Sequence, residues 1–149
     1  QIKIIMKRVT GIRDLSDDHQ GALVLARRCK RGKIKEKPIS KDALWDYVRK
    51  EFSDKINQHF HLEEAYLIPM LETLDLNNEV SRIKEEHEYL RTLVNLSNPD
   101  MDMIRTFGEI LESHVRFEER EVFEKYQQKF PDDILKEISE SWIHFHQNK

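Results

Sequence analysis

The chain has 149 residues, of which 36% are charged and 38% are apolar, and its formal net charge is −3. So small a net charge gives no electrostatic basis for binding nucleic acid or an anionic membrane, and no apolar run approaches the roughly 18 residues that a membrane span requires. The single cysteine, Cys29, cannot form an internal disulfide and fits a reducing cytoplasm. We therefore expect one cytoplasmic domain spanning residues 1–149, with neither nucleic acid nor membrane as its partner.

Helical periodicity begins early in the chain. Only 4 glycines and 4 prolines interrupt it, which favours helices over strands. The first helix is predicted to open near Asp14 or Ser16 and to run to about Gly32. The basic stretch "CKRGKIKEKP" is predicted to be a solvated loop. Ser40 caps a long second helix, which Pro69 is expected to kink or end.

Three more helices follow. The turn "DLNN" leads into a third helix, "SNPD" ends it, and a fourth begins at Asp100 or Asp102. Pro131 suits the first turn of the last helix, "PDDILKEISESWIHFH". Because short connections favour antiparallel neighbours, we predict an all-α, up-down-up-down four-helix bundle with a core at about 14–130. An additional short C-terminal helix is expected at about 131–147.

The apolar faces of the four helices carry histidines and glutamates. His59 is followed four residues later by Glu63, and His114 is followed four residues later by Glu118. Residues four apart lie on the same face of a helix, so each pair faces the bundle interior. Solitary histidines occupy matching positions on the first and third helices, which gives six candidate metal ligands: His19, His59, Glu63, His87, His114 and Glu118.

These six side chains are expected to meet at one level of the bundle, because they lie at similar distances in sequence from the turns that join the helices. A buried carboxylate requires neutralisation. The apolar faces offer no arginine or lysine for that purpose, so a metal cation is the simplest partner. Imidazole and carboxylate ligands suit iron, manganese or zinc, and six ligands exceed what one tetrahedral zinc uses. We predict two iron ions bridged by the two carboxylates, with manganese or zinc as possible substitutes.

Four motifs occur in the order "DDHQGAL", "HFHLEEAYLIPML", "EEHEYL" and "HVRFEEREVF". Together they resemble the hemerythrin-like family, the HHE cation-binding domains. The resemblance covers roughly residues 14 to 130. It implies that His19, His59, His87 and His114 are terminal ligands, and that Glu63 and Glu118 bridge a non-haem di-iron centre. It further implies reversible binding or sensing of dioxygen, sensing of redox state or iron, or the handling of nitric oxide and peroxide.

Two positions depart from the oxygen-carrying hemerythrins. Those proteins have H-x-x-x-H on the third helix, whereas the position four residues before His87 is Ile83 here. Their fourth-helix carboxylate lies five residues after the histidine, where this chain has Glu119. The helical face favours Glu118, and Glu119 stays open as an alternative ligand. These departures point to the broader HHE group, and they suggest a further open position on the metal held by His87 and His114.

The sequence thus predicts a metal- and oxygen-binding protein, rather than a dedicated enzyme, whose partner is a small diatomic ligand or peroxide. Two alternatives use the same residues: a peroxidase-like di-iron oxidoreductase, and a helical interaction module in which the metal only staples the bundle. His61 lies about 200° around the helix from His59 and is expected to face solvent. His144 and His146, two residues apart, are not expected to bind one metal.

Overall fold

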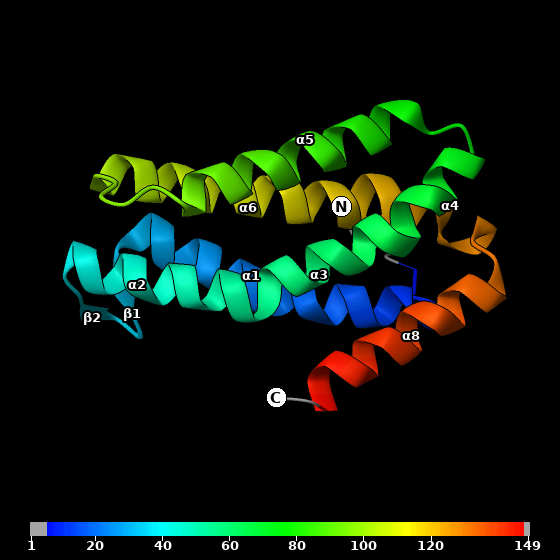
Figure 1. The fold of residues 1–149 in the computed structure, drawn as a ribbon, viewed down its shortest axis with the longest axis horizontal. Helices are drawn as coiled ribbons and strands as arrows, with labels where there is room; N and C mark the ends of the chain where they lie inside the picture. Colours follow the sequence, from blue (N-terminus) through cyan, green and yellow to red (C-terminus); the bar gives the residue numbers. More distant parts are fainter. Residues whose placement is uncertain (1–5, 148–149) are drawn as a thin grey trace, which may run out of the picture.

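The fold is almost entirely helical. The computed structural model describes residues 6–147, so the ends of the predicted domain, residues 1–5 and 148–149, lie outside the described part. The all-α prediction is confirmed. The α-helices are α1 (Ile12–Arg31), α2 (Lys41–Glu51), α3 (Asn57–Leu62), α4 (Ile68–Thr73), α5 (Asn77–Val94), α6 (Met101–Phe117), α7 (Glu124–Tyr126) and α8 (Asp132–Gln147). Figure 1 shows α1, α2, α5 and α6 lying along a common long axis, with α8 slanting away at one end.

The second long helix contains two π-helical segments. It runs through α2, η1 (Phe52–Ile56), α3, η2 (Glu63–Leu67) and α4. Pro69 was expected to kink or end this helix, but the helix continues to Thr73, with Pro69 in the first turn of α4. Proline lacks an N–H and clashes with the carbonyl one turn earlier. The π-helical segment η2 ends at Leu67, two residues before Pro69, so the wider turn falls where the proline interrupts the regular α-helical pattern.

The observed helix starts agree with two predictions and differ from a third. The side chains of Ser40 and Asp100 accept hydrogen bonds from the N–H groups of Ala43 and Met103, at 3.1 Å and 2.8 Å, as N-caps do. The first helix begins at Ile12, before the predicted Asp14 or Ser16. Gly11 allows this early start, because its φ is 85° and a Cβ there would collide with the backbone of α8.

The basic connector forms a small hairpin, not the loop that was predicted. Strand β1 (Lys33–Ile34) pairs antiparallel with β2 (Lys37–Pro38). Lys35 and Glu36 have φ values of 52° and 64°, which matches a tight two-residue turn. Two residues per strand give too little alternation for a sequence pattern to detect.

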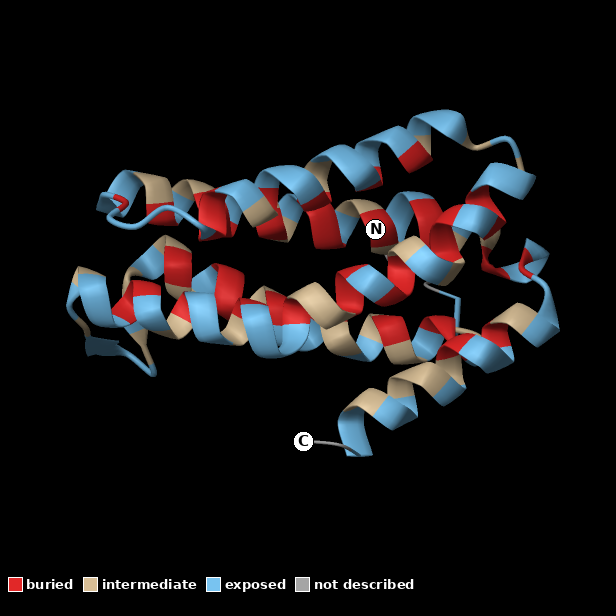
Figure 2. Ribbon diagram, viewed as in Figure 1, coloured by how far each residue is buried: buried red, intermediate tan, exposed pale blue. Residues whose placement is uncertain are grey.

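Two apolar clusters fill the interior on either side of a polar layer. The first cluster contains Leu25, Leu44, Phe52, Leu90 and Phe107 among its members. The second contains Ile12, Leu15, Leu67, Ile83 and Phe123 among its members. Buried residues line the inward faces of the long helices in Figure 2, and exposed residues cover the outward faces. On each helix, the predicted metal ligands lie between residues of the first cluster and residues of the second cluster.

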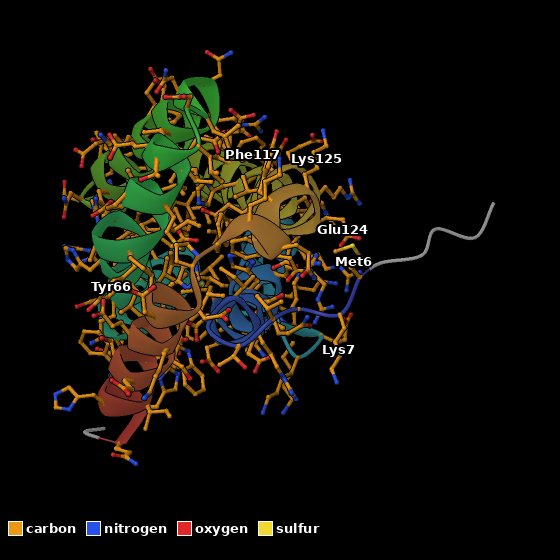
Figure 3. The ribbon with its side chains drawn as sticks, turned by 90° about the vertical axis from the view of Figure 1, so that its right-hand side faces the viewer. Met6, Lys7, Tyr66, Phe117, Glu124 and Lys125 are labelled. Carbon is orange, nitrogen blue, oxygen red and sulfur yellow. The ribbon has the colours of Figure 1, made fainter. Side chains whose placement is uncertain are left out.

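The N-terminal segment is tied to the end of the bundle. A third π-helical segment, η3 (Glu118–Phe123), follows α6 and leads through α7 to the 3₁₀ turn η4 (Gln127–Lys129). The Met6 N–H donates to Glu124 Oε1 at 2.7 Å, and the two residues lie side by side in Figure 3. The Val9 N–H donates to the buried side chain of Gln127 at 2.9 Å. Among the described residues, no helix is both long and apolar enough to cross a membrane.

Candidate metal centre

Both glutamates of the repeated motif stand at the start of a π-helical segment. Glu63 is the first residue of η2, and Glu118 is the first residue of η3. In each case the glutamate N–H is shared between the carbonyl oxygens three and four residues earlier. A π-turn widens the helix and redirects the side chains around it. The same local device therefore aims both carboxylates at the centre of the bundle.

All six predicted ligands are buried, and they converge. Their relative exposures range from 0% to 6%. His19 comes from α1, His59 from α3, His87 from α5 and His114 from α6. The ligand atoms form two groups, and within each group all of them lie within 4.8 Å of one another. The first group comes from His19, His59, Glu63 and Glu118, and the second from Glu63, His87, His114 and Glu118.

Each glutamate spans the two histidine pairs. Glu63 Oε2 lies 3.2 Å from His59 Nε2, and Glu63 Oε1 lies 3.0 Å from His87 Nε2. Glu118 Oε1 lies 2.9 Å from His19 Nε2, and Glu118 Oε2 lies 3.2 Å from His114 Nε2. One oxygen of each carboxylate thus faces the His19–His59 pair, and the other oxygen faces the His87–His114 pair. The ring centroids are 4.9 Å apart within both pairs, so the centre is close to two-fold symmetric.

Four atoms at this centre lack a hydrogen-bond partner among the described residues. They are His59 Nε2, Glu63 Oε2, His114 Nε2 and Glu118 Oε2. Buried polar atoms without partners are rare in native proteins, and each one requires an explanation. Imidazole nitrogens and carboxylate oxygens are metal ligands. The donor set therefore fits a pair of metal ions, with one ion beside each pair of histidines.

A second ring of acidic side chains holds the histidines from outside. Each Nδ1–H donates to a carboxylate on a neighbouring segment. The pairs are His19 with Glu119 at 2.6 Å, His59 with Asp18 at 2.9 Å, His87 with Glu64 at 2.7 Å and His114 with Glu86 at 2.8 Å. This bond fixes the tautomer and leaves Nε2, which faces the centre, free to bind a metal.

The outer carboxylates have partners of their own. Arg8 lies 3.1 Å from Glu119, Arg91 lies 2.7 Å from Glu64, and Arg82 lies 3.1 Å from Glu86. Asp18 differs from these three, because it accepts from the indole N–H of Trp142 on α8 at 3.0 Å. Burial raises the pKa of Glu64, but its hydrogen bonds from His87 and Arg91 lower that pKa further, to about 2. Glu64 is therefore ionised at neutral pH and acts only as an acceptor.

Without a metal, three of the central imidazoles, His19, His59 and His114, have a raised pKa. Burial lowers the pKa of His114, yet the negative charge of Glu118 and the bond to Glu86 raise it to about 10. The pKa of His59 is raised well above its usual value, because Glu63 and Asp18 outweigh the effect of burial. Burial raises the pKa of Glu118, but the charge of His114 brings it well below its usual range. The carboxylate of Glu118 and the imidazole of His114 thus favour each other's charged form.

The structure also places the residues left outside the predicted site. The His61 side chain is 61% exposed, as expected. His146 stacks on Trp142 at 3.8 Å, outside the six-residue cluster. Glu119, the alternative to Glu118, contacts the outer nitrogen of His19, whereas Glu118 contacts the inner one. Ile83 is fully buried in the second apolar cluster.

Sequence reasoning missed the outer acids, although a local signal was present. In each of the four motifs, an acidic residue is adjacent in sequence to a predicted ligand: "DH" at 18–19, "EE" at 63–64, "EH" at 86–87 and "EE" at 118–119. Adjacent residues on a helix point about 100° apart. An acidic side chain next to a predicted ligand therefore points toward a neighbouring helix, where it contacts a histidine.

The fold and the centre together define a class: a helical protein with a buried histidine and carboxylate cluster suited to cations. Comparison with known families agrees, since the model described as "Hemerythrin HHE cation binding domain" matches residues 10–126. The chain belongs to this family, which confirms the resemblance carried by the sequence motifs. Neither a curated protein nor a solved structure matches the chain.

Proposed function

We propose that the chain binds two non-haem iron ions and that the iron pair binds a small ligand, namely dioxygen, nitric oxide or peroxide. His19 and His59 would hold one ion, His87 and His114 would hold the other, and Glu63 and Glu118 would bridge them. The observation that supports this assignment best is the position of the two carboxylates, each with one oxygen beside each pair of histidines.

Iron bound here would supply redox chemistry and coordination positions that no protein side chain fills. The residues of the chain have three other tasks. Four imidazoles would bind the metals through Nε2, the outer carboxylates hold the ring orientation, and the two apolar clusters limit the access of water. The single buried cysteine, Cys29, is compatible with work in a reducing cytoplasm.

Metal analysis is the first test of this proposal. Protein expressed with iron available should carry close to two iron ions per chain, because the ligand atoms form two overlapping groups. Protein prepared without oxygen should then change its absorption spectrum when dioxygen, nitric oxide or peroxide is added. A long-lived spectrum would indicate carriage or sensing, and rapid bleaching with turnover would indicate an oxidoreductase. One zinc ion per chain and no second metal would contradict the proposal.

A further inference from the structure

A cavity lies beside the histidine and carboxylate cluster. Its volume is about 320 Å³, and α1, η1, α3, α6 and α8 all contribute to its walls. Three histidines of the cluster, His19, His59 and His114, line it, but Glu63, Glu118 and His87 do not. The cavity is therefore a separate space next to the metal centre and not the space between the ligands.

The volume of this cavity exceeds what a diatomic ligand needs. A water molecule takes about 30 Å³ of liquid volume, and dioxygen, nitric oxide or peroxide is of comparable size. Pockets for organic ligands begin at about 300 Å³. The observed 320 Å³ lies at the lower end of that range, so the space suits a molecule of roughly ten non-hydrogen atoms.

Much of the cavity lining is apolar. Leu25, Ile56, Phe60, Val115 and Phe145 are among the side chains that line it. Polar side chains also line it: the buried histidines of the cluster, and the exposed or half-buried Asp17, Glu51, Lys55 and His146. A cavity lined in this way favours a mainly apolar ligand that carries one polar group.

The charged side chains that line the cavity disfavour an anionic ligand. Lys55 Nζ lies 3.2 Å from Glu51 Oε2, so its charge is already matched. Asp17 and Asp18 also line the cavity, and the carboxylate oxygens of Asp18 already accept from His59 Nδ1 at 2.9 Å and from the Trp142 indole N–H at 3.0 Å. A carboxylate or phosphate entering here would meet like charge, whereas a neutral molecule would not.

Gly21 leaves one side of the cavity open. It lies within α1 and lines the cavity, and a Cβ at this position would meet nothing within 4 Å. Glycine inside a helix is unfavourable relative to alanine. Among the described residues nothing approaches this position closely, so a side chain added at Gly21 would extend into free space at the cavity.

We propose that this cavity binds a small, neutral and mainly apolar organic molecule, whose polar group faces His19 and His59. The inference rests on the proposed function for the nature of the centre that the ligand faces. Such a molecule would lie directly beside one metal position, as a co-substrate or a modulating ligand does. The binding itself depends only on the shape and polarity of the cavity.

Two probes of matched shape test the proposal. Benzyl alcohol is neutral and benzoate is anionic, and each is titrated into isotopically labelled full-length protein, both metal-free and zinc-loaded, while amide NMR shifts are followed. Benzyl alcohol should give saturable shifts at Ala22, Leu25 and Val115, with a dissociation constant on the order of 1 mM or below. Benzoate should bind at least about tenfold more weakly.

Variants on α1 complete the test. Gly21→Leu should weaken benzyl alcohol binding at least about tenfold by filling the cavity, and Ala22→Leu serves as a second filling variant should the first not fold. Gln20→Leu is the matched control, because it adds the same side chain at an exposed neighbour that does not line the cavity. Absent or non-saturable shifts, shifts elsewhere, or equal effects of Gly21→Leu and Gln20→Leu would overturn the inference. Metal content, measured separately, reports on the proposed function alone.

Discussion

Glu118 and Glu119 are neighbours in sequence, yet they contact opposite nitrogens of the same imidazole. Glu118 lies 2.9 Å from His19 Nε2, and Glu119 lies 2.6 Å from His19 Nδ1. We therefore expect substitutions of these two residues to affect metal binding in different ways. Glu118→Gln should lower the metal content below about one ion per chain, because both metal positions share this carboxylate. Glu119→Gln should retain both ions with about 10–100-fold weaker affinity.

Metal content after desalting and competition with a chelator measures both effects. His61→Ala is the control and should behave like the parent protein, because this side chain is 61% exposed. Glu63→Ala should lose metal as Glu118→Gln does, since it removes the other shared carboxylate. Equal metal loss in the His61 and Glu63 variants would contradict the assignment of the ligands.

The raised pKa of His114 predicts how the stability of the metal-free protein changes with pH. Between the unfolded pKa of about 6.5 and the folded pKa of about 10, the folded state binds more protons than the unfolded state does. This contribution to stability is present in full below pH 6.5 and is lost as the pH rises through 10. The melting temperature of the metal-free protein should therefore fall between about pH 7 and pH 10.

Thermal unfolding of chelator-treated protein across this pH range checks that prediction. Zinc-loaded protein is the control and should show a much flatter profile, because a bound metal keeps the imidazoles deprotonated at all of these pH values. Metal-free protein that becomes more stable toward pH 10 would show that His114 is not held as an imidazolium.

At the scale of the helices, Ile83 on α5 presents an aliphatic side chain and no further ligand to the proposed metal centre. It lies one turn before His87 and is fully buried in the second apolar cluster. The sequence suggested that the metal near His87 and His114 is the more open one. The cavity lies against His19, His59 and His114. Ile83 itself is fully buried, and the cavity reaches the centre from the side of α1, α3 and α6, where His114 belongs to the pair that the sequence analysis singled out.

Ile83→His tests this helix position. The added imidazole lies where it can bind the metal near His87, so the iron-loaded variant should hold an oxygen adduct longer than the parent protein does. Without metal, the polar ring in an apolar cluster should lower the free energy of unfolding by about 1–3 kcal/mol. Stopped-flow absorption and denaturant unfolding measure the two effects. Ile83→Val is the control for lost packing, with an expected cost of about 0.5–1.5 kcal/mol and an unchanged adduct lifetime.

The outer acids link the four central helices in a closed ring. Asp18 of α1 bonds to the histidine of α3, and Glu64 of η2 bonds to the histidine of α5. Glu86 of α5 bonds to the histidine of α6, and Glu119 of η3 closes the ring on α1. Each helix thus orients a ligand of the next helix. A shift of one helix would therefore disturb ligands on two helices.

At the scale of the whole molecule, the polar layer separates two apolar clusters, so the metal and the fold are expected to stabilise each other. Metal binding to the folded state alone raises stability by mass action. Removal of the metal with a chelator should therefore lower the melting temperature and part of the helical circular dichroism signal. Re-addition of metal should restore both, and re-addition of calcium, which prefers oxygen ligands, is the control.

Acid should release the metal, because protons compete for the same nitrogens. The raised pKa values of His59 and His114 mean that this competition already operates at neutral pH. Metal loss should be complete between about pH 6 and pH 4, the range in which free histidine and glutamate titrate. Helicity and metal content are followed together during acidification. Full occupancy after prolonged incubation at pH 4 would contradict the ligand set.

The sequence by itself determined the helices and the inward face of each one, because periodicity of 3.6 residues depends only on local geometry. That is why His59 and Glu63, or His114 and Glu118, could be paired without a structure. Sequence reasoning failed where no local rule applies. The hairpin after α1 is too short to show a pattern, and the π-turns that carry Glu63 and Glu118 have no simple sequence signature.

The tertiary structure alone decided which side chains meet between helices. Asp18 is adjacent in sequence to His19, yet it bonds to His59, 41 residues away. The direction in which a helix face points is a local property, but the identity of the facing neighbour depends on how the helices pack. For the same reason, the cavity beside His19 and the contribution of Phe145 of α8 to its lining could not be predicted. A cavity is the space that several packed elements leave between them, and no single segment of sequence encodes it.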